Sequence, residues 1–345
     1  MKTVVSLAIA LPFLFYGCAV HRSRGTDSVN KKDVETAGLR SCVREIKSCS
    51  YKAVLNADGT ISKGMRAGKS SGYDCNSYWV KYNREGYMLA DEEYDRFGHM
   101  IQSFTCKYNK REEKTGFKRF DSLGRLIVRY SYVYDSKGNR LRGSCYNSGG
   151  GIIWESLFKY DHKGNKIEAI AYDSYGNIVW KKMNRYDSYG KITESTNTNN
   201  GREFRLFFKY DKSGRSSGFI KKDGKDSLDM VCTVEYDENG DKTVIRRYYP
   251  GTAAAWTNKN ISDAHGRILN NERFDSNGKR FMRCFFRYDE RGNEIEFRMY
   301  EVNDKLKTVR NSSYVYDEKG NWIKRTVFLK AVPAYIEERE IQYFH

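Results

Sequence analysis

The chain has few prolines (3) and few histidines (5) among its 345 residues. Disordered chains are rich in proline and poor in aromatics, so an aromatic content of 14% excludes disorder. No long apolar run occurs beyond the N-terminus, which excludes several membrane-spanning helices. The sequence also lacks C-x-x-C, H-E-x-x-H and P-loop patterns. We therefore expect no enzymatic activity, no cofactor and no metal site.

The N-terminus carries the single long apolar segment. Val4 to Tyr16 is almost wholly apolar but too short to span a bilayer, as in the central region of a signal peptide. Gly17-Cys18 follows and resembles a bacterial lipobox, although Phe15 and Tyr16 replace its usual residues. The resemblance implies lipidation at Cys18 and attachment to the cell envelope, at the outer membrane and facing the periplasm or the surface. An ordinary secretion signal is the alternative.

Seven cysteines remain after cleavage before Cys18, and their number is odd. A fully paired disulfide framework is therefore impossible. None of them forms a Cys/His cluster with zinc spacing. We expect scattered, buried, free thiols.

One short motif, an aromatic residue followed by Asp-x-x-Gly, recurs along the chain. Clear copies begin at Tyr94, Phe120, Tyr134, Tyr160, Tyr172, Tyr186, Tyr210, Tyr236, Phe274, Tyr288 and Tyr316. From Tyr82 to Tyr186 the starts, degenerate copies included, alternate by 12 and 14 residues, so the period is 26 residues with two turns and two strands. Glycine at this frequency excludes long helices.

The motif has the chemistry of a hairpin turn. Aspartate and glycine three residues apart favour a type I turn closed by a left-handed residue, because Asp accepts backbone N–H groups and Gly tolerates positive φ. Three successive copies carry this pair: Asp161 and Gly164, Asp173 and Gly176, Asp187 and Gly190. Between the turns, apolar residues alternate with exceptions, as in half-buried strands.

These patterns predict an all-β fold, a repetitive antiparallel meander of β-hairpins with a 26-residue period. We expect about 20 strands in one long sheet that is twisted or curled, or that forms an open roll. The predicted segments are a signal peptide (1–17), a lipid-anchor tether (18–33), an N-terminal β cap (34–81) with a hairpin around Asn56 to Gly59, hairpin repeats (82–325) and a C-terminal cap strand (326–345).

The repeats resemble the YD repeats of the RHS family and, more weakly, the repeats of YwqK/MORN-type proteins. The resemblance covers residues 82 to about 325 and the closing segment from Tyr316 to Phe344. It implies a small YD-repeat lipoprotein without a further C-terminal domain.

A second regularity concerns charge, since the formal net charge is +17. Five basic residues precede the motif aromatic in one phase of the repeat, and we call them the basic stripe: Lys81, Lys107, Lys159, Arg185 and Arg287. They could bind an anionic polymer such as a glycan or lipopolysaccharide, or they could merely keep a solvent face soluble.

The function that we expect is that of a non-enzymatic, lipid-anchored envelope protein. It would bind a protein partner or an anionic polymer across its sheet, and nucleic acid is not an expected partner. The alternatives are a structural or shielding element like an RHS shell and an immunity-type protein associated with a toxin.

Overall fold

The computed structural model describes residues 32–67, 77–238, 240, 242–250 and 255–345. Cys18, Cys75 and the predicted signal peptide lie outside the described residues. Within them the chain forms one short helix, α1 (Asp33–Thr36), one 3-10 turn, η2 (Val302–Asp304), and strands throughout the rest. The first strands are β1 (Val43–Leu55), β2 (Ile61–Arg66), β3 (Ser77–Tyr82), β4 (Met88–Tyr94), β5 (Met100–Tyr108), β6 (Lys114–Asp121), β7 (Leu126–Tyr134), β8 (Arg140–Asn147), β9 (Ile152–Tyr160), β10 (Lys166–Asp173) and β11 (Ile178–Tyr186).

The remaining strands continue the same meander. They are β12 (Ile192–Asn199), β13 (Arg202–Tyr210), β14 (Ser216–Asp223), β15 (Leu228–Tyr236), β16 (Lys242–Tyr248), β17 (Ala255–Ser262), β18 (Ile268–Phe274), β19 (Arg280–Tyr288), β20 (Glu294–Tyr300), β21 (Leu306–Tyr316), β22 (Trp322–Leu329) and β23 (Val332–Tyr343). From β3 to β23 each strand pairs antiparallel with the next. The all-β antiparallel meander predicted from the repeat is therefore confirmed.

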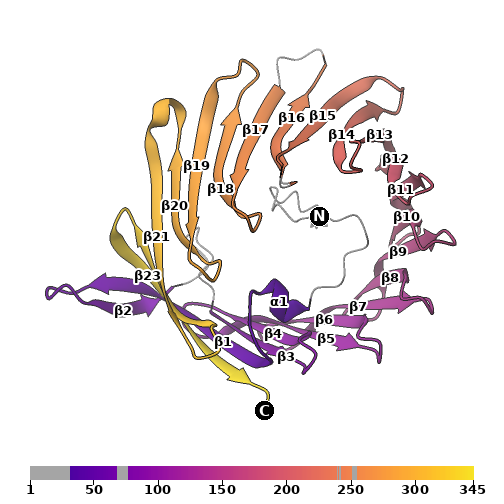
Figure 1. Ribbon diagram of the computed structural model, residues 1–345. Coiled ribbons are helices and arrows are strands. Elements are labelled where there is room, and N and C mark those ends of the chain that lie inside the picture. Colours follow the sequence, from indigo (N-terminus) through magenta and orange to yellow (C-terminus); the bar gives the residue numbers. More distant parts are fainter. Residues whose placement is uncertain (1–31, 68–76, 239, 241, 251–254) are drawn as a thin grey trace, which may run out of the picture.

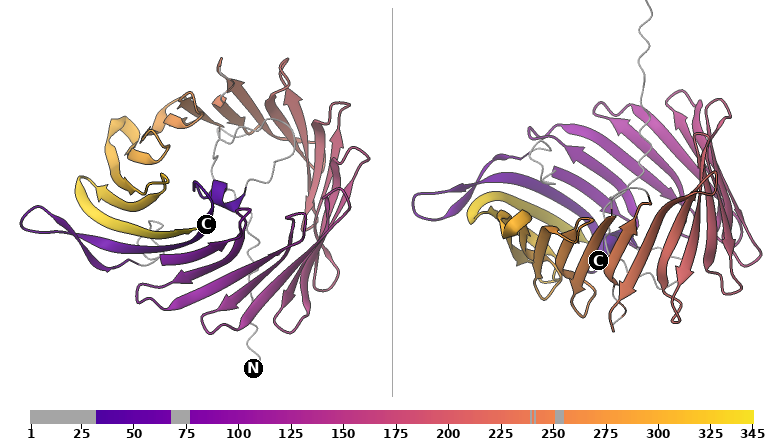
Figure 2. Two further views of the ribbon diagram at one scale, coloured as in Figure 1. Left: turned by 60° about the horizontal axis from the view of Figure 1, so that its bottom comes forward. Right: turned by 90° about the horizontal axis from the view of Figure 1, so that it is seen from above.

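The sheet closes into a β-barrel (Figure 1). β1 pairs antiparallel with β23 along one edge, from Val43 opposite Tyr343 to Lys52 opposite Tyr335. Along its other edge β1 pairs with β3. Among the described residues 22 strands make up the closed sheet, and two further views show the same ring (Figure 2).

The prediction of an open roll or a merely curled sheet is therefore wrong. The repeat motif identifies only strands that are neighbours in the sequence. β1 carries no copy of it, and its two partners come from opposite ends of the repeat array. Closure removes both free sheet edges, each of which would otherwise expose unpaired backbone groups.

The predicted N-terminal hairpin forms but projects from the ring. Gly59 closes its turn with φ +81°, and β1 pairs with β2 from Tyr51 to Leu55. Among the described residues β2 pairs with no other strand, and the hairpin extends away from the barrel in Figure 1. β1 thus closes the barrel from Val43 to Lys52, and its last residues continue with β2 into the projecting hairpin.

The segment that contains α1 lies inside the ring and defines the inner face (Figures 1 and 2). Val34 and Leu39 of this segment pack on Ile46, Val80 and Tyr82, all less than 10% exposed. These strand side chains therefore point inward. Because neighbours along a strand point to opposite faces, the pairing registers extend the assignment around the barrel.

Closure can be tested with a native thiol. Cys49 on β1 lies opposite Glu338 on β23, and paired residues in a sheet have the Cα separation that a disulfide requires. Oxidised Glu338→Cys should therefore form a bond between residues 49 and 338 and migrate faster on non-reducing gels. Glu340→Cys, which lies opposite Lys47, is the control and should not. Absence of the Cys49-dependent shift would contradict the closed barrel.

Candidate functional site

The hairpin turns share one geometry, which the turn at Asp161 illustrates. Its Oδ1 accepts the backbone N–H groups of Lys163 (2.9 Å) and Asn165 (2.8 Å). The Gly164 N–H donates to the Asp161 carbonyl (3.1 Å), and Gly164 has φ +86°. Hydrogen bonds from the side chain and backbone of Asn165 hold the pKa of Asp161 below its usual value. The carboxylate is thus engaged in shaping the turn.

The next two turns repeat this arrangement. Asp173 and Asp187 each accept the two corresponding backbone N–H groups. Gly176 has φ +83° and Gly190 has φ +80°. These are the backbone conformations that the sequence pattern predicts, so the six turn residues form structural elements at the two ends of the barrel.

Replacing a turn glycine should destabilise the protein through φ alone. Gly176→Val should lower the free energy of unfolding by at least about 1 kcal/mol, because a side chain disfavours positive φ. A Cβ at Gly176 meets no atom within 4 Å, so no clash contributes. Denaturant midpoints measure the effect, and Gly149→Ala, in a turn but without positive φ, is the control. Equal midpoints for the two variants would contradict this reading.

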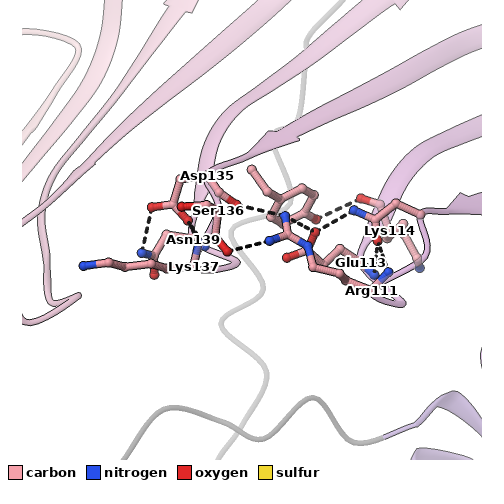
Figure 3. Close-up of polar contacts among 9 residues, drawn as sticks. Arg111, Glu113, Lys114, Asp135, Ser136, Lys137 and Asn139 are labelled. Carbon is pink, nitrogen blue, oxygen red and sulfur yellow. Dashed lines mark hydrogen bonds and ion pairs between the residues drawn. The ribbon is translucent and has the colours of Figure 1, made fainter.

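Neighbouring turns at one end of the barrel also contact each other (Figure 3). Arg111 donates from its guanidinium to the carbonyls of Asp135 (2.9 Å) and Ser136 (2.6 Å) in the next turn of the same phase. Lys163 makes the equivalent contact with the Ser188 carbonyl (3.1 Å). These contacts tie each hairpin turn to the next turn at the same end of the barrel, in addition to the pairing of the strands between them.

The tyrosines that end alternate strands point inward and anchor the barrel wall. The hydroxyl of Tyr134 donates to the Lys114 carbonyl (2.8 Å) and that of Tyr160 to the Arg140 carbonyl (3.0 Å), each 20 residues earlier. The same contact recurs at Tyr108, Tyr186, Tyr236 and Tyr288. These phenol groups therefore stabilise the barrel wall by hydrogen bonds to the backbone.

The basic stripe points outward but is not continuous. Its residues belong to β3, β5, β9, β11 and β19, and β11 and β19 lie on different sides of the ring in Figure 1. Val133 occupies the corresponding place on β7 and interrupts the stripe. The structure therefore separates Arg287 from the other four residues.

Three of the five stripe residues form ion pairs with glutamates. In three cases the basic side chain pairs with a carboxylate on the following strand: Lys159–Glu168 (2.7 Å), Arg185–Glu194 (3.1 Å) and Arg287–Glu296 (3.4 Å). Of the other two, Lys81 lies over the Trp79 ring, 3.9 Å from its centre, and Lys107 lies opposite Gly116. Such exposed pairs add little stability. Glu168 also pairs with Lys181 (3.1 Å) and Glu296 with Arg298 (2.5 Å), so each of these two carboxylates is shared between two cations.

The inner face carries a ladder of aromatic rings that sequence reasoning did not single out. Ring centres of Phe104 and Phe117 lie 5.3 Å apart, those of Phe117 and Tyr130 also 5.3 Å, and those of Tyr130 and Trp154 6.0 Å. The last pair flanks Cys145, which is opposite both residues. Three further inward pairs are Phe208–Phe219, Phe286–Phe297 and Tyr314–Trp322.

Cations lie over many of these inner rings. The Arg140 guanidinium is 5.3 Å from the centre of the Tyr132 ring and 5.2 Å from that of Phe158. The arrangement recurs in Lys166 over Phe158 (5.0 Å), Lys221 over Phe204 (4.8 Å), Arg247 over Trp256 (4.7 Å) and Arg310 over Phe297 (5.2 Å). The inner face thus presents flat rings and positive charge together.

A cavity of about 290 Å³ lies where the barrel closes, between the α1 segment and the inner face. Two carboxyl side chains of β4, Asp91 and Glu93, line one side, and Arg339 of β23 lines another. Burial and the neighbouring carboxylates of Glu93 and Glu92 raise the pKa of Asp91 to about 6. Ionising a partly buried carboxyl at neutral pH lowers the free energy of unfolding.

Removing this carboxyl should stabilise the protein at neutral pH. The pKa of Asp91 rises from its ordinary 3.8 to about 6 on folding, so stability falls as the pH rises from 4 to 6. At pH 8 we expect Asp91→Asn to raise the free energy of unfolding by about 1–2 kcal/mol, allowing for solvent that reaches the site, and at pH 4 by little. Glu45→Gln, on the outer face of β1, is the control. A pH-independent difference would refute this assignment.

The cysteines follow the prediction in part. Cys106, Cys145, Cys232 and Cys284 are buried and form no disulfide with another described residue, and burial raises the pKa of Cys106, Cys145 and Cys284. Cys42 is exposed. In the described part of the chain no group of three or more His, Cys, Asp or Glu side chains could hold a metal ion.

No helix within the described ranges is long and apolar enough to cross a membrane.

Comparison with known proteins gives no family. No family model matches the chain, and no curated protein does. The resemblance to YD repeats therefore stays a prediction.

Solved structures resemble the chain at low identity. A chain of the TcdB2-TccC3-Cdc42 complex is 12% identical with a TM-score of 0.36, covering 82% of this chain and 21% of its own length. A chain of the Tc holotoxin pore of Photorhabdus luminescens is 12% identical with a TM-score of 0.31 over 83% and 21%. A porin-like protein of Bacteroides uniformis is 8% identical with a TM-score of 0.32 over 88% and 99%. The chain thus spans about a fifth of the toxin-complex chains, and similarity at this level does not indicate a function.

Proposed function

We propose that this chain is a non-enzymatic binding protein of the bacterial cell envelope, anchored by lipid at Cys18, which binds an extended anionic polymer along the inner face of its barrel. The observation that carries the proposal is the combination of aromatic rings with overlying cations, as at Arg140 between Tyr132 and Phe158. Sugars and other flat groups stack on such rings, while cations hold the charges of an anionic chain.

The inner face is favoured over the basic stripe because it combines cations with accessible aromatic rings, although two of its cations, Lys221 and Arg310, also have carboxylate partners. Outside, Lys159 and Arg185 already have glutamate partners. Inside, the Phe104, Phe117 and Trp154 side chains are only half-buried. In closed sheets of this size side chains do not fill the interior, so a polymer can reach these rings.

Tryptophan fluorescence distinguishes the two faces. The chain has five tryptophans, of which Trp79 points outward and Trp154, Trp180, Trp256 and Trp322 point inward. Titrating the full chain with lipopolysaccharide or heparin should change the emission in a salt-sensitive way, because each neutralised charge on a polyanion adds to the salt dependence. A Trp79→Phe variant should retain the whole change. No salt-sensitive change with either polymer would overturn the proposal.

Replacing all five stripe residues by glutamate tests the rival surface. On our proposal this variant keeps its β signature and most of its polymer affinity. Loss of binding in the stripe variant, with the inner tryptophans unaffected by polymer, would assign binding to the outer face instead.

Anchoring at Cys18 has a separate test. Cys18→Ser should move the protein from the membrane fraction to the soluble fraction, since acyl chains on the cysteine supply the attachment. The ion pairs on the outer face agree with anchoring by lipid, because a lipid-facing barrel surface would be apolar. A variant that stays in the membrane fraction as the wild type does would contradict lipidation.

Closure of the sheet favours a second candidate, a shell that shields a partner polypeptide. This function predicts that a protein encoded beside this chain co-purifies with it and resists protease only in the complex. An unprotected partner would exclude it.

A further inference from the structure

The cavity at the barrel closure has opposite charges at its two ends. Arg339, Ser48, Tyr78 and Glu93 form one row across β23, β1, β3 and β4. Three strand spacings separate the first from the last, or about 14 Å between their backbones. Asp91 lies in the adjacent row on the same face, opposite Val80. The cation and the carboxyl pair therefore face one cavity from opposite sides.

Two buried polar atoms at these ends lack hydrogen-bond partners within the described part of the chain. One is Oδ1 of Asp91 and the other is Nε of Arg339. Glu93, by contrast, accepts a hydrogen bond from Gln102 (2.7 Å), and the flat face of the Arg339 guanidinium lies over the Trp322 ring (3.3 Å). Buried polar groups in native proteins are almost always satisfied, so the unpartnered oxygen of Asp91 points to an absent polar ligand. Several other arginines also have an unpartnered Nε, and Arg339 contributes to the site as the cation that lines the cavity.

Apolar groups line the space between the two ends. Leu39 of the α1 segment covers it, Ile46 and Val80 form its floor, and the Tyr78 and Tyr82 rings flank it. Its volume of about 290 Å³ is close to the lower limit for small-molecule sites, about 300 Å³. A ligand that fits must be charged at both ends and apolar in the middle.

We propose that this cavity binds a small zwitterion, with its ammonium group against Asp91 and Glu93, its acid group near Arg339 and an apolar chain of several carbons between them. A diamine would place a cation beside Arg339, and a dicarboxylate would place an anion beside Asp91. Each would leave a like-charged pair in a partly buried site, which is unfavourable. This proposal does not rest on polymer binding at the inner face.

Calorimetry on the full chain at pH 7.5 tests the proposal with 6-aminohexanoate as the probe. Hexanoate and hexylamine each retain one charged end. We expect 6-aminohexanoate to bind at least tenfold more tightly than either. No binding of 6-aminohexanoate at millimolar concentrations, or equal affinity for a single-ended analogue, would overturn the proposal.

Two variants assign the two ends. Asp91→Asn should weaken 6-aminohexanoate binding at least tenfold but leave hexanoate binding unchanged. Arg339→Gln should also weaken 6-aminohexanoate binding at least tenfold but leave hexylamine binding unchanged. Glu45 lies next to the cavity residue Ile46 on β1 but faces outward, and Glu45→Gln should bind like the wild type. Equal losses in Glu45→Gln and Asp91→Asn would show that the effect is not local. Circular dichroism confirms that each variant is folded.

Binding should also depend on pH. Affinity for 6-aminohexanoate should fall from pH 7.5 to pH 5, because Asp91 takes up a proton and no longer attracts the ammonium group. The other charged or titratable groups that face Asp91 are Glu93 on β4, Tyr78 and Tyr82 on β3, Arg339 on β23 and Asp33 beside the cavity. In Asp91→Asn the pH dependence should be lost or greatly reduced. An unchanged pH profile in that variant would remove Asp91 from the site.

Discussion

Ending the chain after Leu329 should open the barrel and make the protein self-associate. The truncation removes β23, which pairs with β1 over nearly the whole length of both strands and buries Ile336 to 1% exposure. It leaves β22 and β1 with free edges, and unpaired edges recruit other strands. Analytical ultracentrifugation should show concentration-dependent assembly that the intact chain lacks.

The matched control ends the chain after Tyr343. This version keeps every β1–β23 pair and should sediment like the intact protein. A β23-truncated chain that stays dispersed and unfolds at the wild-type midpoint would show that closure contributes nothing to the fold.

Gly218→Ala should be among the most damaging single substitutions in the barrel. Gly218 on β14 has φ +140°, and a Cβ there would lie 2.0 Å from the backbone carbonyl oxygen of Cys232 on β15. Backbone cannot yield as a flexible side chain can, so the two strands must separate locally. We expect a loss of at least about 2 kcal/mol in the free energy of unfolding.

Gly116 gives the matched control because it has the same place on β6, one strand after a motif tyrosine. Its φ is not positive, and a Cβ there would lie 3.5 Å from the Tyr130 carbonyl oxygen, an ordinary contact. Gly116→Ala should therefore shift the denaturant midpoint only slightly. Similar midpoints for the two alanine variants would mean that the close approach at Gly218 is relieved at little cost.

The hairpin meander was predictable because its signals are local. Asp161 and Gly164 lie in one turn, and their chemistry determines that turn whatever surrounds it. The pairing of β1 with β23 involves residues almost 300 positions apart, and neither strand carries a sequence motif that identifies the other as its partner. Closure therefore depends on the summed twist of all strands, which no single motif encodes.

One feature of the surface could have been recognised from the sequence, and another could not. Glu168, Glu194 and Glu296 each follow a stripe residue by nine positions. In this repeat, that spacing places each glutamate on the next strand, directly opposite its stripe residue. That spacing would have identified the paired charges. Which face is the inner one could not be recognised, because aromatic residues occupy both: Tyr108 points inward, whereas Tyr94 points outward.

The antiparallel closure also restricts how this barrel can change in size. Since β1 runs antiparallel to both β3 and β23, the number of strands in the ring must be even. Gaining or losing one complete 26-residue unit changes the count by two and the circumference by about 10 Å, with the closure intact. Gaining a single strand would reverse the direction of every later strand and bring β23 to β1 in the wrong orientation. Relatives of this barrel should therefore differ in length by whole hairpin units.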